Sequence, residues 1–552
     1  MSLSSRFVAD LYKLPKRRCG VIRTRRIMVP MRDGVELATE HFAPKLPGKH
    51  PTILMREPYG LSGFATIGEV YAERGYHVVL QACRGTDKSG GVFDPFGHER
   101  DDGLDTIEWV KRQPWFDGRL GTSGPSYLGY AQWAICDALP RHSAMAVKVT
   151  SAEFRSVVFP GGTLAVGLWL SWLQTIEGLR GNPLRTAQRM FTGGIDRATL
   201  RATMKLPLRD ADKRVTGAKV PFWRRWMDEA VGSDTFWQPL DHTHRIGVRT
   251  PPTSFVSGWY DFMLDQLLRD YAMLVDAGQT PQLTIGPWFH VSPDLQKESV
   301  RQTLSWMDEK LLGEPSDVRS RPVRLHVSGV AEWYEFEAYP PGAPDVQIWH
   351  VHPDGVLSQR PVRASPPDTY RYDPRDPTPA VGGAMFAFVG AGPVDQAPLE
   401  RRDDVLVYTS EPLFNPVTVI GQVRATIYAR SSLTNTDVFV RLCDVDENGV
   451  SINICDGIVR KTSADPAVPD DIWKLNIRLH ATAHCFRRNH RLRLVVASGQ
   501  HPRYARNTGT DEPLGDATQL VAADVEIFHD PQHPSTIHLP VFEIDAASRL
   551  QS

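Results

Sequence analysis

The chain has 552 residues, a length that usually corresponds to about three domains. Hydrophobic residues make up 41% and charged residues 23% of it, as in globular proteins, and a formal net charge of −1 provides no bulk attraction for nucleic acid or an anionic membrane. Six scattered cysteines form no Cys-x-x-Cys pair, which favours unpaired thiols in a reducing compartment and predicts a cytoplasmic location. We expect neither a secretory signal nor a membrane span, because the N-terminus lacks a continuous apolar core and no window approaches the roughly 18 apolar residues of a span.

The first part of the chain predicts strands that alternate with helices. Residues 27–42 predict a β-hairpin around the turn Arg32-Asp33-Gly34, and helices are expected at 106–112 and 130–139. Strands separated by helices favour a mostly parallel sheet covered on both faces, so we expect an α/β fold. The strands expected in this sheet comprise residues 52–56, 77–82, 119–122, 146–150, 253–257, 282–285 and 323–327.

Two later segments have a different character. Between about residues 152 and 245 strand signals fade, and apolar residues recur at helical spacing, as in 164–173. An insertion of helices at the active edge of a sheet is a natural cap. From about residue 350, Pro and Gly turns separate short β-branched segments, which predicts an antiparallel β-sandwich or jelly roll. The expected domains are therefore an α/β sheet domain in two parts (1–150 and 246–350), a helical cap (151–245) and a β jelly roll (351–552).

The segment Gly121-Thr-Ser-Gly-Pro-Ser126-Tyr-Leu-Gly129 carries the main chemical signal. It lies between an expected strand and an expected helix, where a serine bracketed by glycines is typical of a nucleophile elbow. Gly124 and Gly129 bracket Ser126 with one residue more than the lipase spacing, and an ordinary Gly-rich turn is the alternative.

A serine nucleophile needs a base, and the base needs a group that orients it. In α/β-hydrolases these residues follow in the order Ser, Asp or Glu, His, each just after a strand. Asp261 follows strand 253–257, and His290 follows strand 282–285. A helix N-cap is the alternative for Asp261 and a surface loop for His290, while Asp265 competes for the role of the acid.

Acyl transfer also needs hydrogen-bond donors for the developing oxyanion. The backbone N–H of Tyr127, directly after the serine, is one candidate. The hydroxyl of Tyr59, which follows the strand at 52–56, is a second, although an aromatic in this place is more often a packing residue.

With these motifs the chain resembles the family of serine hydrolases that holds cocaine esterase, X-Pro dipeptidyl-peptidases, α-amino-acid ester hydrolases and glutaryl-cephalosporin acylases. The resemblance covers nearly the whole chain. Its landmarks are Arg56-Glu-Pro-Tyr59, Arg84-Gly-Thr-Asp-Lys-Ser-Gly-Gly91, Asp105-Thr-Ile-Glu-Trp-Val110, Gln113-Pro-Trp-Phe-Asp-Gly118, Gly124-Pro-Ser-Tyr-Leu-Gly129, Gly258-Trp-Tyr-Asp261, Gly286-Pro-Trp-Phe-His290, Asp437-Val-Phe-Val-Arg-Leu-Cys-Asp-Val445, Cys455-Asp-Gly-Ile-Val-Arg460 and Arg503-Tyr-Ala-Arg-Asn507.

The resemblance implies an α/β-hydrolase domain with a helical cap and a C-terminal all-β jelly roll. It implies Ser126 as nucleophile, His290 as base and Asp261 as orienting acid, with the Tyr59 hydroxyl and the Tyr127 N–H as oxyanion hole. Two residues depart from the family pattern, and neither removes a catalytic group. They are Pro125 before the serine and Asp87 in place of a common glycine.

Pocket residues are expected from two other segments. Trp172 lies where the similar cocaine esterase has an acyl-pocket tryptophan, with core packing as the alternative. Met385 and Phe386 reach the site from the third domain in this interpretation. The apolar stretch 164–173, with Trp169 and Trp172, favours a bulky hydrophobic or aromatic acyl group.

The leading prediction is thus a cofactor-free serine esterase that acts on a small-molecule ester or amide, with homo-oligomerisation left open. An X-Pro dipeptidyl-peptidase or an amidase or acylase is the alternative, and it would need a carboxylate for the substrate ammonium, from Glu153, Glu177 or Asp196. A non-catalytic ligand-binding protein is the alternative from another class. No metal is expected, because the calcium-like segment that starts at Asp444 would have Cys455 at its twelfth position, and a hairpin turn explains that segment better.

Overall fold

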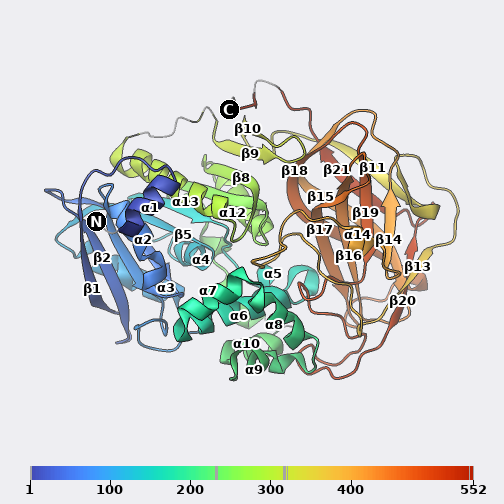
Figure 1. The fold of residues 1–552 in the computed structure, drawn as a ribbon, viewed down its shortest axis with the longest axis horizontal. Coiled ribbons are helices and arrows are strands. Elements are labelled where there is room, and N and C mark those ends of the chain that lie inside the picture. Colours follow the sequence, from blue (N-terminus) through green and yellow to red (C-terminus); the bar gives the residue numbers. More distant parts are fainter. Residues whose placement is uncertain (1–2, 230–233, 315–318, 320, 546–547, 551–552) are drawn as a thin grey trace.

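The computed structural model describes residues 3–229, 234–314, 319, 321–545 and 548–550, which form two large sheets and a group of helices (Figure 1). The first sheet has ten strands in the order β1-β2-β4-β3-β5-β6-β7-β8-β9-β10. Along this order the strands from β4 to β9 are parallel, while β1, β2 and β10 pair antiparallel. Their bounds are β1 (Val21–Pro30), β2 (Glu36–Pro44), β3 (His50–Glu57), β4 (His77–Ala82), β5 (Phe116–Pro125), β6 (His142–Lys148), β7 (Thr253–Tyr260), β8 (Gln282–Phe289), β9 (Val323–Val327) and β10 (Glu332–Phe336).

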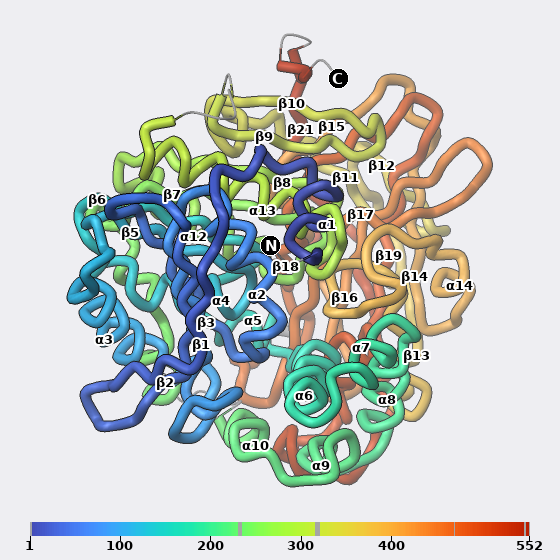
Figure 2. The backbone as a smooth tube through the Cα atoms, turned by 60° about the vertical axis from the view of Figure 1, so that its left-hand side comes forward, coloured from blue at the N-terminus to red at the C-terminus, as the bar shows by residue number. Residues whose placement is uncertain are grey.

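Both faces of this sheet are buried beneath helices. Successive side chains of a strand point to opposite sides and so enter different cores. In β4, Val78 and Leu80 join the core beneath α2 (Leu61–Ala72) and α13 (Pro293–Met307), whereas Val79 joins the core beneath α3 (Glu99–Lys111). The other face is also covered by α4 (Tyr127–Trp133) and α12 (Leu264–Asp276). The N-terminal helix α1 (Leu3–Leu11) packs on α2 (Figures 1 and 2).

The strands predicted at 77–82 and 323–327 are confirmed in full as β4 and β9, and the predicted hairpin at 27–42 lies within the longer pair β1–β2. The strand predicted at 146–150 is wrong in its bounds. β6 ends at Lys148, because Val149 leaves the extended region with a φ of 40°. The helix expected at 130–139 begins earlier, at Tyr127, and ends at Trp133.

A group of helices lies between β6 and β7, at the bottom of Figure 1. Its core is aromatic: Trp169 packs edge-on against Trp226, with ring centroids 4.8 Å apart. The main helices are α5 (Arg155–Val158), α6 (Val166–Gly181), α7 (Pro183–Phe191), α8 (Gly194–Thr203), α9 (Ala211–Thr216), α10 (Pro221–Asp228) and α11 (Asp234–Trp237).

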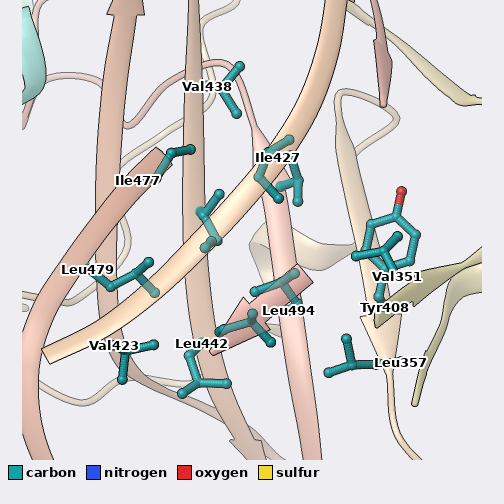
Figure 3. Close-up of a cluster of buried hydrophobic side chains, with 14 of the residues drawn as sticks. Val351, Leu357, Tyr408, Val423, Ile427, Val438, Leu442, Ile477, Leu479 and Leu494 are labelled. Atoms are coloured by element: carbon teal, nitrogen blue, oxygen red, sulfur yellow. The ribbon is translucent and has the colours of Figure 1, made fainter. Parts of the chain in front are cut away.

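The second sheet has eleven strands and forms the C-terminal β domain, whose pairing is mostly antiparallel. Its order is β13-β20-β15-β21-β11-β12-β14-β19-β16-β17, with β18 paired to β15. Apolar residues of β15 and β18, such as Val423 and Leu479, share one buried core with Leu442 and Leu494 of β16 and β19 (Figure 3). The strands are β11 (Asp345–His352), β12 (Val356–Ser358), β13 (Asp368–Tyr372), β14 (Val405–Thr409), β15 (Val417–Ser431), β16 (Thr436–Val445), β17 (Ser451–Lys461), β18 (Trp473–Phe486), β19 (Arg491–Ala497), β20 (Ala523–Phe528) and β21 (Thr536–Val541).

β11 crosses the domain boundary that the sequence analysis set at residue 351. The strand belongs to the second sheet, where it pairs with β21 and β12, so this sheet starts earlier than expected. Within the described residues, no helix has the length and apolar character needed to cross a membrane.

Candidate active site

Ser126 occupies the sharp turn between β5 and α4, with φ 57° and ψ −121°. A positive φ is uncommon for any residue other than glycine, and it marks strained backbone. Two neighbours hold the turn: the Ser126 N–H donates to the Lys148 carbonyl at 2.9 Å, and the Thr150 hydroxyl donates to the Ser126 carbonyl at 2.7 Å. The side chain of Ser126 is thereby presented at the carboxyl edge of the sheet, as a nucleophile elbow requires.

The two glycines of the motif are required by close contacts. Gly124 has a φ of 149°, and a Cβ there would lie 2.3 Å from Cβ of Leu128. A Cβ on Gly129 would lie 2.5 Å from Cβ of Thr150, the residue that also holds the Ser126 carbonyl. The extra residue in the G-x-S-x-x-G spacing therefore places the second glycine where the helix passes closest to the loop after β6.

Asp261 and His290 form a buried pair at the same edge of the sheet. Asp261 directly follows β7 and His290 directly follows β8, and the Asp261 Oδ2 to His290 Nδ1 distance is 2.5 Å. Asp261 is fully buried, and its Oδ1 accepts the N–H of Met263 at 2.8 Å. With Nδ1 engaged in this way, Nε2 is the ring nitrogen available for proton transfer.

Asp265 has a different role from Asp261, although the sequence left both as candidates for the acid. Asp265 lies in the first turn of α12, and its carboxylate reaches into the β domain. Its Oδ2 is 3.2 Å from Nδ1 of His480, and its Oδ1 accepts the N–H of Ala481 at 3.1 Å. These contacts assign Asp265 to the junction between α12 and β18.

Tyr59 reaches Ser126 from the loop after β3. Its hydroxyl lies near the Ser126 side chain, which helps to set the pKa of the phenol, and it accepts the indole N–H of Trp172 at 3.2 Å. Burial raises the pKa of Tyr59 to about 12, so the phenol remains a neutral donor at neutral pH. Trp172, on α6, thus connects the helical segment to this hydroxyl.

Glu57, which was not among the residues predicted from the sequence, positions the Tyr59 loop. Glu57 is fully buried at the end of β3, and its Oε2 accepts the N–H groups of Tyr59 at 2.5 Å and Gly60 at 2.8 Å. Burial raises the pKa of Glu57 to about 8 despite these two bonds. An acidic residue inside the Arg56-Glu-Pro-Tyr59 landmark, at the end of a buried strand, is the signal that could have identified it.

Asp87 also supports this loop. It has a φ of 47°, which explains why glycine is common in its place. Aspartate tolerates this region better than most residues, and its Oδ2 accepts the N–H of Leu61, the first residue of α2, at 3.1 Å.

The side chain of Tyr127 points away from Ser126, into a buried polar network. Its hydroxyl donates to Glu99 at 2.9 Å and accepts the N–H of Phe96 at 2.9 Å. Glu99 in turn pairs with Arg56 at 3.0 Å. The backbone N–H of Tyr127 begins α4, so it has no carbonyl partner within the helix and is free for a ligand at the elbow.

A cavity of about 690 Å³ lies where α6, α8, α12 and the β domain meet. Phe262 and Phe386 line it and also face His290, with ring centroids 4.4 Å and 5.8 Å from the imidazole. The structure thus brings Ser126, Tyr59 and Trp172 together in one set, and Asp261, His290 and Phe386 in another.

The three carboxylates considered for a substrate ammonium differ in their surroundings. Glu153 pairs with Arg269 at 2.9 Å, and Glu177 pairs with Arg180 at 3.0 Å. Asp196 lines the cavity, and its buried Oδ2 has no hydrogen-bond partner in the described structure.

The calcium-like segment is the hairpin turn between β16 and β17. Asp446 Oδ1 accepts the N–H groups of Asn448 and Val450, and Asp444 is engaged by His484 and His490, each at 2.8 Å. Over the described ranges, no group of three or more His, Cys, Asp or Glu residues could hold a metal ion.

The family models for X-Pro dipeptidyl-peptidase (S15 family) and for its C-terminal non-catalytic domain match residues 33–292 and 317–538. The chain is 32% identical to cocaine esterase from Rhodococcus sp. (strain MB1 Bresler), in an alignment that covers 94% of this chain and 98% of that protein.

Two solved structures share the fold. An aminopeptidase from a marine sediment archaeon (Thaumarchaeota) is 23% identical, with a TM-score of 0.80 over 96% of this chain and 98% of that one. An α-amino-acid ester hydrolase is 22% identical, with a TM-score of 0.79 over 97% of this chain and 99% of that one. The chain therefore belongs to the X-Pro dipeptidyl-peptidase (S15) family and is a serine hydrolase.

Proposed function

We propose that this chain hydrolyses carboxylic esters through an acyl-enzyme intermediate on Ser126. The observation that carries the proposal is the convergence at one sheet edge of a strained serine, a tyrosine hydroxyl near it and a buried carboxylate–imidazole pair. The 32% identity to cocaine esterase over 94% of the chain supports the same chemistry.

In this proposal His290 Nε2 takes the proton of the Ser126 hydroxyl as its oxygen attacks the ester carbonyl. The Tyr59 hydroxyl and the Tyr127 N–H donate to the oxyanion that forms. Collapse of the tetrahedral intermediate expels the alcohol, which receives the proton from His290. Water then repeats the sequence on the acyl-enzyme and releases the carboxylic acid. Asp261 keeps the Nδ1 proton of the imidazole in place throughout.

The helices between β6 and β7 act as a cap in this proposal, and the C-terminal β domain is a jelly roll. Trp172 from the cap supports the oxyanion tyrosine, and Phe386 from the segment between β13 and β14 forms a wall beside His290. The free thiols of all six cysteines, five of them buried, support a place in a reducing compartment such as the cytoplasm.

Replacement of Ser126 by alanine tests the nucleophile. Ser126→Ala should lower kcat for a p-nitrophenyl ester by about 10³-fold or more, because no other group can carry the acyl chain. A fluorophosphonate probe should label the wild-type protein and not the variant. Turnover that persists in folded Ser126→Ala protein would show that another residue is the nucleophile.

A matched pair of substitutions separates the two aspartates. Asp261→Asn should lower kcat by about 10³- to 10⁴-fold, because the amide no longer holds the imidazole in the required tautomer. Asp265→Asn should retain kcat within about threefold and lower the urea midpoint, since it weakens the bond to His480. The reverse pattern of activities would make Asp265 the acid.

Tyr59→Phe removes one hydroxyl and keeps the ring. We expect kcat to fall by about 10²- to 10³-fold, the usual effect of losing one oxyanion donor, with little change in KM or Tm. Tyr370→Phe, which removes a buried hydroxyl bonded to Ser498 in the β domain, is the matched control and should leave kcat unchanged. A loss of stability with normal kcat in Tyr59→Phe would assign Tyr59 to packing alone.

An aminoacyl ester or amide is the second candidate substrate, and the unpartnered Oδ2 of Asp196 favours it. Burial raises the pKa of Asp196 to about 6. The carboxylate would therefore bind an ammonium above that pH and lose it as the pH falls through this value.

A substrate pair tests the preference. The apolar walls at 164–173 favour an uncharged acyl group, so we expect a higher kcat/KM for a phenylacetyl ester than for the matched phenylglycyl ester. Asp196→Asn should leave both values within about twofold. A preference of about tenfold or more for the phenylglycyl ester, lost in Asp196→Asn, would instead favour the aminoacyl function.

A further inference from the structure

Lys148 is a buried lysine directly behind the nucleophile elbow. It is the last residue of β6, and the alternation of the strand places it on the same face as Ala144 and Ala146, toward α2 and α13. Its exposed fraction is 3%. All fourteen lysines of the chain lie in its described part, and the other thirteen are exposed or half-buried. Burial of an amine costs free energy, so the burial of this one lysine requires an explanation.

The neighbours of Lys148 are hydroxyl groups. Its Nζ donates to Oγ of Ser123 at 3.2 Å, and this oxygen lies 3.4 Å from Oγ1 of Thr303. The phenols of Tyr71, from α2, and of Tyr12 are the titratable groups that line the same cavity as the amine. No carboxylate of the described residues pairs with Lys148, so most of the donor capacity of the amine is unused.

A cavity of about 330 Å³ opens onto this cluster. Lys148, Ser123, Tyr71 and Ser299 give it polar groups, and the buried Oγ of Ser299 has no partner in the described structure. The cavity lies between α1, α2 and α13, which are neighbours in Figures 1 and 2. Its remaining walls are largely apolar and include Phe7, Val8, Met55, Phe64, Ile67 and Val300.

We propose that this cavity binds a small monocarboxylic acid with an apolar tail. The carboxylate lies against Lys148 and the hydroxyls of Ser123 and Ser299, and the tail lies against the apolar walls from α1, α2 and α13. One amine balances one negative charge, so a doubly charged phosphate would leave a charge uncompensated in a buried site. A neutral apolar ligand would leave the amine and the Ser299 hydroxyl unpaired.

The proton needed for this ion pair is available near neutral pH. Burial lowers the pKa of Lys148 to about 7, so the free protein holds the amine partly uncharged. A bound carboxylate stabilises the ammonium, and binding therefore takes up a proton above that pH. The apparent affinity should fall as the pH rises above about 7, approaching a tenfold loss per pH unit.

The site is connected to the catalytic serine through the backbone. The carbonyl of Lys148 accepts the N–H of Ser126, and Ser123, Gly124 and Pro125 form one wall of the cavity. Carboxylic acids are also the products of ester hydrolysis. This last link, and only this one, depends on the proposed function: the acid released by the enzyme would be a ligand of the site behind its own nucleophile.

Calorimetric titration with phenylacetate tests the proposal. We expect the affinity to fall about tenfold or more between about pH 7 and pH 9. Proton uptake should appear as a binding enthalpy that depends on the ionisation enthalpy of the buffer. Phenethylamine, which has the same ring and an ammonium in place of the carboxylate, should not bind. In Lys148→Met the pH-dependent binding should disappear, while Lys88→Met, which changes an exposed loop lysine, should behave as the wild type.

Two further variants keep the test decisive. Ser123→Ala should weaken binding without the volume change at Lys148, so a poorly folded Lys148→Met protein does not leave the question open. Ser126→Ala should bind phenylacetate as the wild type does, so a failure of the esterase assignment and a failure of this site are distinguishable. The proposal is overturned by the absence of binding, or by binding that is equal in wild type and Lys148→Met.

Discussion

The strained backbone of Ser126 is the constraint on which the arrangement of the site depends. Its φ of 57° is held by the Lys148 carbonyl on one side and the Thr150 hydroxyl on the other, both of them from the end of β6 and the loop after it. Those contacts require β5 and β6 to be parallel and in register, and they require α4 to pass close to the loop after β6. Gly129 permits that approach, since any side chain would collide with Thr150. The sheet therefore fixes the proposed nucleophile before any substrate is present.

The remaining site residues come from distant parts of the chain that meet at this edge. Trp172 extends from α6 to the Tyr59 hydroxyl, and Phe386 reaches His290 from the segment between β13 and β14. Asp265 fastens the start of α12, four residues after Asp261, to β18 of the C-terminal domain. The loop that carries Asp261, the proposed orienting acid, is thus supported by the β domain, which explains why a domain without the serine is part of the same unit.

Local sequence predicted much of this arrangement, because its signals are local. A Gly-bracketed serine between a strand and a helix, and an Asp and a His that each follow a strand, could be ordered without knowledge of long-range contacts. Asp265 could not be separated from Asp261 in this way, since its partner His480 is distant in the sequence. Whether Glu153, Glu177 or Asp196 forms an ion pair or lines the cavity depends on how the helices between β6 and β7 pack, which local sequence does not determine.

Errors in strand bounds had chemical consequences. With a strand at 146–150, Lys148 would lie in its middle, and its burial at the end of β6, beside Ser123, could not be inferred. Glu57 was passed over for a similar reason, because a strand that ends at Arg56 places the glutamate in a loop. The roles of these two residues depend on where a strand ends, which hydrophobic patterning determines least well.

Glu57 and Lys148 both lie near the elbow. Glu57 is on the side of the Tyr59 loop, and Lys148 is on the side of α13. Burial shifts their pKa values in opposite directions, to about 8 for Glu57 and about 7 for Lys148, and each shift is toward the uncharged form. This matters because an ionised Glu57 would oppose a negative charge at the Tyr59 hydroxyl, where the proposed oxyanion develops. A neutral acid can instead hold the backbone of the tyrosine loop without adding that repulsion. Burial thus lets the fold use an acidic side chain to hold the backbone beside a site that is proposed to stabilise negative charge.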